Sequence, residues 1–239
     1  MTIAEFFGCA FLAFGPPMSM FILTVAIDPI RIIIMIAASF FWVLSILLSS
    51  IIWFIVVPLR DRLWFGAIVS ILLQELFRYV VYKLIRKSER GLQDITESSR
   101  VVENKHILAY VSGLGFGIIS GLFALSNVLA DLTGPATMGL NGGTEIFFII
   151  SAAQTLCMIF LHTFWSIIFF NAWDTSKYTH VAYVVFSHLL VSLLTLFNKS
   201  GLYTASLIPN YIIVILTGIL AFKVAGGSFL SFKRFVTCK

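Results

Sequence analysis

Seven apolar segments, each about as long as a bilayer is thick, constrain this chain more than any other feature of its sequence. A transmembrane helix needs about 20 predominantly apolar residues to cross the hydrocarbon core. Runs of this kind occupy residues 6–26, 30–57, 64–84, 108–130, 146–170, 181–197 and 207–225. We therefore predict an all-α polytopic membrane protein, in which a single seven-helix transmembrane domain takes up residues 1–239.

The composition excludes an ordinary soluble enzyme or binding domain. Charged residues make up 11% of the chain and hydrophobic residues 59%, and the mean hydropathy is +1.01. A soluble domain would carry about 25% charged residues. The formal net charge of +5 gives no support to nucleic-acid binding, because its placement follows the preference of Lys and Arg for cytoplasmic loops.

The distribution of basic residues predicts the orientation of the chain in the membrane. The long polar connection from Lys83 to Lys105 is rich in Lys and Arg, and so is the C-terminal tail from Lys233 to Lys239. With seven spans, both fall on the same side. The opposite side carries few basic residues. The positive-inside rule then places the N-terminus outside or in the lumen and the C-terminus in the cytoplasm.

The fourth apolar segment combines a membrane-spanning length with glycines at every fourth position. Gly113, Gly117 and Gly121 align along one face of a helix, so a second helix can approach that face at backbone distance. In lipid, stripes of small residues are typical of helix–helix contacts. Two partners for this face remain open: another helix of the same chain, or a separate subunit.

Four charged or histidine side chains lie inside the predicted spans and away from the span ends, where such side chains are expensive and usually structural or functional. Glu75 and Arg78 are three residues apart on one helical face and can neutralise each other. His162 and His188 lie in the fifth and sixth spans. Counting about 1.5 Å per residue from the span ends, we predict that all four share one pocket that opens toward the cytoplasmic half. The alternative is four separate polar contacts.

A metal-dependent hydrolase is the alternative function that these residues suggest. Glu75, His162 and His188 could in principle hold zinc, and the pattern resembles the intramembrane prenyl endopeptidases, which carry Glu-Glu-x-x-x-Arg followed by two histidine-bearing helices. The sequence departs from that pattern, because Gln74 replaces the first glutamate and Arg78 comes one residue early. We therefore predict neither a metal site nor a catalytic residue in this chain.

Several stretches together resemble the anterior pharynx-defective (Aph) family, a subunit of γ-secretase. The resemblance covers nearly the whole chain, and the glycine-rich stretch YVSGLGFGIISG is its most specific part. The stretches are residues 6–9, 14–16, 28–31, 40–42, 74–78, 110–121, 161–165, 187–190 and 225–228.

This resemblance implies a non-catalytic scaffold that uses no cofactor. In the family, the subunit joins nicastrin and then holds presenilin and the presenilin-enhancer subunit. Presenilin carries the catalytic aspartates and cleaves type I membrane proteins such as Notch and the amyloid precursor. The resemblance assigns Gly113, Gly117 and Gly121 to helix packing and assembly, and His162 and His188 to maturation of the complex. It also implies the membranes of the endoplasmic reticulum, Golgi, cell surface and endosomes.

Overall fold

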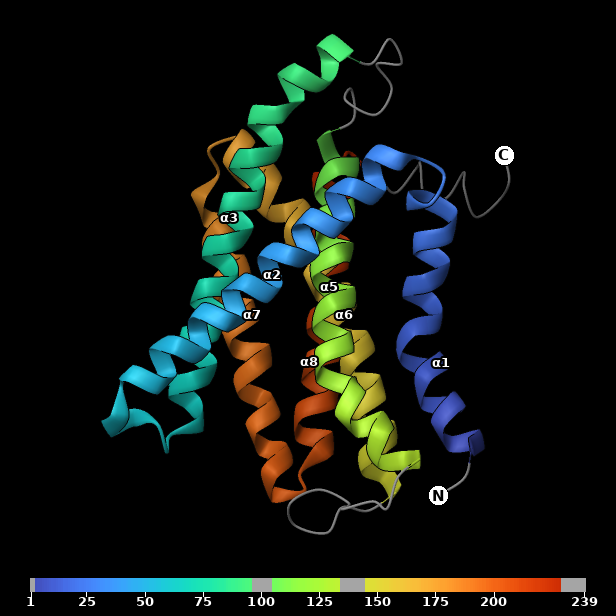
Figure 1. Ribbon diagram of the computed structural model, residues 1–239, viewed down its shortest axis with the longest axis vertical. Helices are drawn as coiled ribbons and strands as arrows, with labels where there is room; N and C mark the ends of the chain where they lie inside the picture. Colours follow the sequence, from blue (N-terminus) through green and yellow to red (C-terminus); the bar gives the residue numbers. More distant parts are fainter. Residues whose placement is uncertain (1–2, 96–104, 134–144, 229–239) are drawn as a thin grey trace.

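The computed structural model describes residues 3–95, 105–133 and 145–228, and within them the chain forms a bundle of long helices (Figure 1). Seven helices of the described residues are long and apolar enough to cross a membrane, which confirms the predicted all-α membrane fold. Their bounds are α1 Ile3–Met20, α2 Pro29–Ile55, α3 Leu63–Ile95, α5 Lys105–Thr133, α6 Glu145–Asp174, α7 Tyr178–Leu194 and α8 Tyr203–Val224.

Three short helical segments complete these spans. A π-helical segment, η1 (Phe21–Val25), continues α1. Two 3-10 turns, η2 (Val57–Leu59) and η3 (Thr195–Ser200), end the second and sixth spans. The start of α2 follows a local signal in the sequence: Asp28 caps the helix by accepting a hydrogen bond from the Ile30 amide (2.9 Å), and Pro29 occupies the first turn.

Helix α3 extends well beyond the apolar segment that predicts it. The third span was expected to end near residue 84, but α3 continues to Ile95. In the additional turns, Arg86 pairs with Glu89 three residues further on, at 2.9 Å. Hydropathy therefore marks the part of the helix that lies in hydrocarbon, whereas the backbone hydrogen bonds of the helix continue into the polar region beyond it.

Helices α5 and α6 form the centre of the bundle. The most apolar stretch of α5 is 61% buried and that of α6 is 50% buried, whereas the corresponding values for the other spans are 28% or less. Helix α5 packs on α6, α2 and α1, and α6 also packs on α8 and α7. Figure 1 shows α2 crossing α5 at a steep angle before it turns back into α3.

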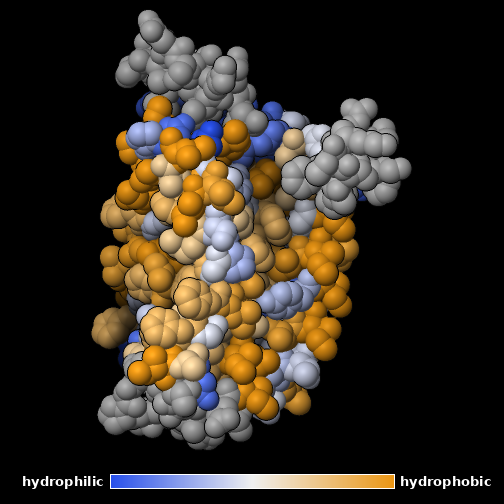
Figure 2. Space-filling view, turned by 90° about the vertical axis from the view of Figure 1, so that its right-hand side faces the viewer, coloured by the Kyte–Doolittle hydropathy of each residue, from blue (hydrophilic) through white to orange (hydrophobic). Residues whose placement is uncertain are grey.

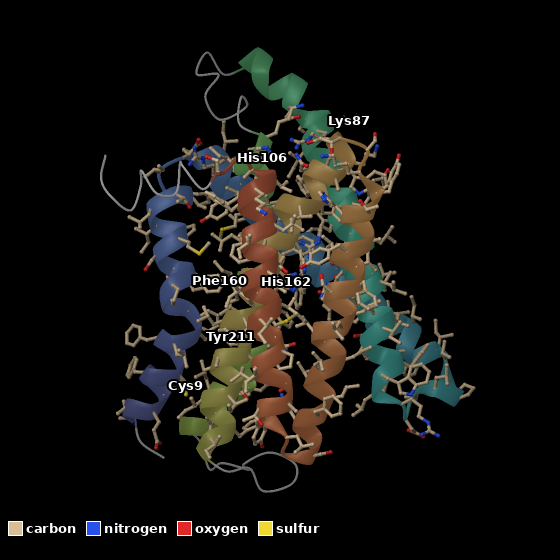
Figure 3. The ribbon with its side chains drawn as sticks, turned by 180° about the vertical axis from the view of Figure 1, so that it is seen from behind. Cys9, Lys87, His106, Phe160, His162 and Tyr211 are labelled. Atoms are coloured by element: carbon tan, nitrogen blue, oxygen red, sulfur yellow. The ribbon has the colours of Figure 1, made fainter. Side chains whose placement is uncertain are left out.

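Polar and apolar surfaces are segregated along the bundle. Figure 2 shows apolar side chains over the flank, with hydrophilic residues gathered toward its ends. Lys87 and His106 lie together at one end of the bundle, and Cys9 lies near the other (Figure 3). The end that carries Lys87 is the one that the positive-inside rule predicts to be cytoplasmic. It is called the basic end below.

Candidate functional site

The centre of the site is an ion pair within α3. Arg78 donates from Nε to Glu75 Oε2 (3.0 Å) and from Nη2 to Glu75 Oε1 (3.2 Å). The two residues are one turn apart, so the helix itself sets this geometry. Only 1% of Arg78 and 5% of Glu75 is accessible. Such deep burial requires that the remaining polar atoms of both side chains also find partners.

Arg78 also joins α3 to α6. Its Nη1 donates to the His162 carbonyl oxygen (3.2 Å) and to the Ser166 hydroxyl, and its Nη2 lies 3.0 Å from His162 Nδ1. A guanidinium has no acceptor, so Nδ1 of His162 must accept. The proton of a neutral His162 is therefore on Nε2.

His188 brings α7 into the same cluster. Its Nδ1 lies 2.7 Å from Glu75 Oε1, and its ring stacks on the Trp165 indole, with centroids 4.4 Å apart. The rings of His162 and His188 meet edge to face at 5.1 Å. The structure thus brings the four predicted polar residues together, rather than leaving them as separate contacts.

Other residues complete this polar cluster without having been predicted for it. The Ser166 hydroxyl oxygen accepts from Arg78 Nη1, and the guanidinium carbon lies 5.0 Å from the centroid of the Phe116 ring. Trp165 donates from Nε1 to the Ser187 hydroxyl (2.9 Å). These partners come from α5, α6 and α7, so no spacing within one helix reveals them.

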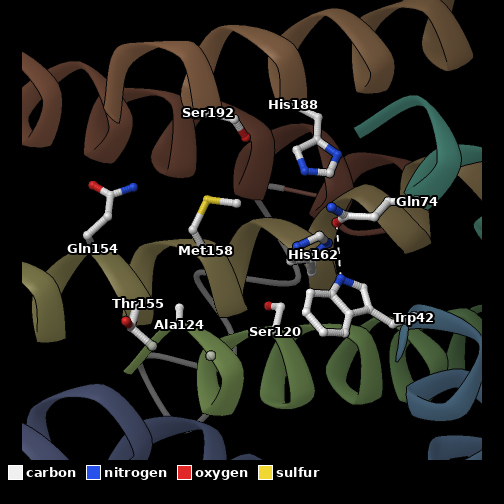
Figure 4. Close-up of a pocket in the computed structure, with 11 residues that line it drawn as sticks. Trp42, Gln74, Ser120, Ala124, Gln154, Thr155, Met158, His162, His188 and Ser192 are labelled. Atoms are coloured by element: carbon white, nitrogen blue, oxygen red, sulfur yellow. Dashed lines mark hydrogen bonds between the residues drawn. The ribbon is translucent and has the colours of Figure 1, made fainter. Parts of the chain in front are cut away.

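A cavity of about 210 Å³ adjoins the cluster (Figure 4). At one end, Trp42 donates from Nε1 to Gln74 Oε1 (3.0 Å), close to both histidines. The residues that line it are Trp42, Gln74, Ser120, Gly121, Ala124, Gln154, Thr155, Met158, His162, His188 and Ser192. Among the residues that the structure describes, the Gln154 amide nitrogen is buried and has no hydrogen-bond partner.

The cavity extends from the histidines toward Ala124, Gln154 and Ser192. These three residues lie further from the basic end along α5, α6 and α7. The sequence predicts a pocket that opens toward the cytoplasmic half, and the side of the membrane on which each end of the bundle lies stays a prediction of the positive-inside rule. Counting residues locates a side chain along its helix, but the hollow lies where small residues such as Ser120 and Gly121 leave space.

A second charged cluster lies nearer the basic end. Arg86 of α3 forms paired hydrogen bonds to Asp174 of α6, from Nε at 3.0 Å and from Nη2 at 2.6 Å. Tyr82 also donates to Asp174 at 3.0 Å. Asp174 lies beyond the predicted span 146–170 and is the last residue of α6. The two clusters hold α3 to α6 at two depths.

The glycine face of α5 lies against α6 in this structure. A Cβ atom added at Gly117 would lie 2.7 Å from the Ile159 carbonyl oxygen, and one at Gly113 would lie 2.7 Å from Ser166 Cβ. At Gly121 the nearest atom, 2.8 Å away, is the end of the Ile159 side chain. The described contacts therefore use this face for packing within the chain.

Gly115, which the every-fourth-residue pattern omits, serves a different contact. A Cβ added there would lie 2.6 Å from the Met35 carbonyl oxygen of α2. The Ser39 hydroxyl donates to the Gly115 carbonyl oxygen at 3.1 Å. Two glycine faces thus allow two helices to approach α5 closely, which accounts for its central position.

The geometry does not favour the hydrolase alternative. Arg78 lies between Glu75 and His162 and donates to both, so its positive charge occupies the place between two of the proposed ligands. Among the described residues, no group of three or more His, Cys, Asp and Glu side chains is placed to hold a metal ion. The Glu75 carboxylate and the His162 imidazole are both bound to Arg78, and in this arrangement they connect α3 to α6.

The fold and the site together define an integral membrane protein with a hydrogen-bonded polar core. The chain belongs to the Aph-1 protein family, whose model matches residues 4–228. It is 62% identical over 239 residues to gamma-secretase subunit Aph-1 of Drosophila melanogaster, covering all of both chains. It is 44% identical to gamma-secretase subunit APH-1B of Homo sapiens, covering 100% of this chain and 95% of that one. With gamma-secretase subunit aph-1 of Caenorhabditis elegans the identity is 32%, over 97% of this chain and 82% of that one. These relatives support the γ-secretase role and give no support to the hydrolase alternative.

Proposed function

We propose that this chain is a non-catalytic scaffold subunit of the γ-secretase complex. In this role it stabilises presenilin and assembles it with nicastrin and the presenilin-enhancer subunit. The assembled complex then cleaves type I membrane proteins such as Notch and the amyloid precursor, with the catalytic aspartates supplied by presenilin. The relatives named as γ-secretase subunits support this proposal over the full length of the chain.

The observation that carries the scaffold role is the pairing of the buried charges. Glu75 is engaged by Arg78 and His188, and Arg78 is engaged by Glu75, His162 and Ser166. A catalytic acid or base needs a free lone pair or proton directed at a substrate. Here both carboxylate oxygens of Glu75 and the N–H groups of Arg78 are used to connect α3, α6 and α7, which gives the partners a bundle of fixed shape.

The proposal extends to the roles of individual residues and to location. Gly113, Gly117 and Gly121 set the spacing of α5 and α6, on which the outer surface of the bundle depends. Glu75, Arg78, His162 and His188 set the position of α3 and α7. The complex works in the membranes of the endoplasmic reticulum, Golgi, cell surface and endosomes.

Isolation of the tagged chain in a mild detergent, followed by mass spectrometry, tests this function. We expect presenilin, nicastrin and the presenilin-enhancer subunit in stoichiometric amounts, and cleavage of a type I membrane substrate by the isolated complex. The chain purified alone should have no such activity. The variant Arg78→Leu should reduce the recovery of the partner subunits. The control variant Lys87→Gln, at an exposed position of the same helix, should leave their recovery unchanged. Cleavage by the chain alone, or isolation without the partners, would contradict the proposal.

A further inference from the structure

The cavity beside the polar cluster has hydrogen-bonding groups at both ends and is not accounted for by the scaffold role. His162 and His188 lie at one end, and Gln154 lies at the other (Figure 4). Met158 lies between them and presents carbon and sulfur atoms. A molecule that fills the whole cavity therefore meets polar groups at its two ends and an apolar wall along its middle.

The histidine end offers one donor and one acceptor. His162 Nδ1 accepts from Arg78 Nη2 (3.0 Å), so the proton of the neutral ring is on Nε2. The Glu75 carboxylate only accepts, so His188 Nδ1 donates to it at 2.7 Å, and Nε2 of a neutral His188 keeps its lone pair. A hydroxyl group both donates and accepts, so a single hydroxyl complements the free positions of the two rings.

The opposite end offers a buried donor without an acceptor. Gln154 Oε1 accepts from the Asn210 amide at 3.2 Å, whereas Gln154 Nε2 has no partner in the part of the chain that the structure describes. The hydroxyls of Ser120 and Thr155, which also line the cavity, donate at 2.8 Å to carbonyl oxygens of their own helices. Because an unpaired buried N–H group is costly, a ligand with an acceptor at this end is favoured.

The length and volume of the cavity limit the size of a ligand. Gln154 and His162 are eight residues apart on α6, or about 12 Å at about 1.5 Å per residue. A cavity of about 150 Å³ holds benzene, so one of about 210 Å³ suits about eight non-hydrogen atoms. Water in a protein needs about two to four polar partners. Met158 and Ala124 do not supply them, whereas methylene groups pack well against both.

We propose that this cavity binds a small uncharged diol, a molecule with a hydroxyl group at each end of a short aliphatic chain. One hydroxyl accepts from His162 Nε2 and donates to His188 Nε2, and the other accepts from Gln154 Nε2. The methylene groups lie along Met158 and Ala124. Ala124 is exposed although it lines the cavity, so the cavity opens beside it.

The charges around the cavity favour an uncharged ligand over an ion. Glu75 and Arg78 neutralise each other directly behind the histidine end, and the hydrogen bonds of His162 and His188 are those of neutral rings. An ion in the cavity would lose its hydration without gaining a counter-charge. This binding site does not depend on the proposed scaffold role, because it is formed by the interior of one chain.

Titration of the Met158 methyl signal tests this site on the full chain isolated with its co-purifying subunits. The methionines carry a ¹³C-labelled methyl group, Met158→Leu identifies the signal, and the signal of Met18, which is 44% exposed on α1, serves as the reference. The probe is 1,6-hexanediol, and 1-hexanol is the matched compound without the second hydroxyl. We expect 1,6-hexanediol to shift the Met158 signal saturably without shifting that of Met18. We expect 1-hexanol to bind about tenfold more weakly, because it leaves Gln154 Nε2 unpaired. The cation 6-amino-1-hexanol should not bind.

Variants of the cavity separate its volume from its hydrogen bonds. Ser192→Phe fills the cavity and should abolish the shift, whereas Leu190→Phe, at a 39% exposed position of α7 outside the cavity, should not. Gln154→Leu should weaken the binding of 1,6-hexanediol about tenfold and leave that of 1-hexanol unchanged. A merely structural role of Gln154 would change the binding of both compounds alike.

Three results would overturn the proposal. The first is a Met158 signal that does not shift saturably with 1,6-hexanediol, which is the outcome for a cavity that holds water only. The second is equal affinity for 1,6-hexanediol and 1-hexanol, or a difference between them that persists in Gln154→Leu. The third is tighter binding of 6-amino-1-hexanol, which would make the cavity a cation site.

Discussion

The contact between α5 and α6 can be tested by adding a single methyl group at Gly117. In Gly117→Ala the new Cβ would lie 2.7 Å from the Ile159 carbonyl oxygen and 3.0 Å from Ile159 Cα. Both are backbone atoms of α6, so no side-chain rotation relieves the overlap and the two helices must separate. Overpacking of this kind costs about 1–3 kcal/mol. The gain in helix propensity from glycine to alanine returns at most about 1 kcal/mol.

The matched control is Gly8→Ala in α1. Outside its chain neighbours and the backbone of its own helix, no heavy atom lies within 4 Å of a Cβ added at Gly8, so this variant keeps the gain in helix propensity without the overlap. We expect the free energy of unfolding of Gly117→Ala to fall by about 1–2 kcal/mol, and that of Gly8→Ala to stay unchanged or rise. Gly121→Ala should lie between them, because the atom it meets is the end of the Ile159 side chain.

Reversible unfolding in mixed detergent micelles, followed by circular dichroism over a series of SDS fractions, gives these free energies. Co-isolation of the partner subunits, measured in parallel, shows whether the spacing of α5 and α6 also matters for assembly. Equal stability of Gly117→Ala and Gly8→Ala would show that the bundle tolerates separation of α5 from α6. In that case the steric argument for the glycine face would be wrong.

Three further predictions concern the charges and the topology. Arg78→Leu should lower the free energy of unfolding by about 3–5 kcal/mol, because it leaves Glu75 buried without its cation. Combining Glu75→Gln with Arg78→Leu should recover part of this loss. A double variant less stable than Arg78→Leu alone would refute the pairing. The purified chain should contain no stoichiometric zinc by elemental analysis, and zinc that disappears in both His162→Ala and His188→Ala would restore the hydrolase alternative. When protease is added to a sealed vesicle, the epitope tag at one end of the chain should be cleaved and the tag at the other end protected. Two protected tags, or two cleaved tags, would contradict the seven-span topology.

The fold could be predicted because bilayer thickness sets the length of each apolar segment. Hydropathy located all seven spans but ended the third near residue 84, whereas α3 runs to Ile95. The missing turns contain Arg86 and Glu89, which leave the hydrocarbon while remaining helical. A transfer free energy measures where a residue leaves the lipid, and it contains no information on where the backbone hydrogen bonds stop.

The polar cluster could be predicted in its members but not in its connections. Glu75 and Arg78 are related by helical spacing, and isolated histidines in apolar segments stand out. The contacts of Arg78 with Ser166 and Phe116, by contrast, depend on how α3, α5 and α6 are arranged around one another. The same holds for Gly115, whose close approach to Met35 follows from the crossing of α2 and α5. Spacing along one helix does not determine such contacts.

The polar cluster supplies positional information that apolar packing does not. Helix α3 packs mainly on α2 and α7, yet Arg78 reaches α6 through its long side chain and contacts both His162 and Ser166. Between helices in lipid, apolar surfaces have little preference for one rotation over another, because lipid tails are as apolar as leucine. Rotating α3, or moving it by one turn, would expose the charges of Glu75 and Arg78 to hydrocarbon, and this cost rises steeply with displacement. A buried ion pair adds little net stability when compared with well-packed apolar residues. Its effect here is to select one arrangement of α3, α6 and α7, which is the property that a scaffold needs if several partners are to recognise its surface.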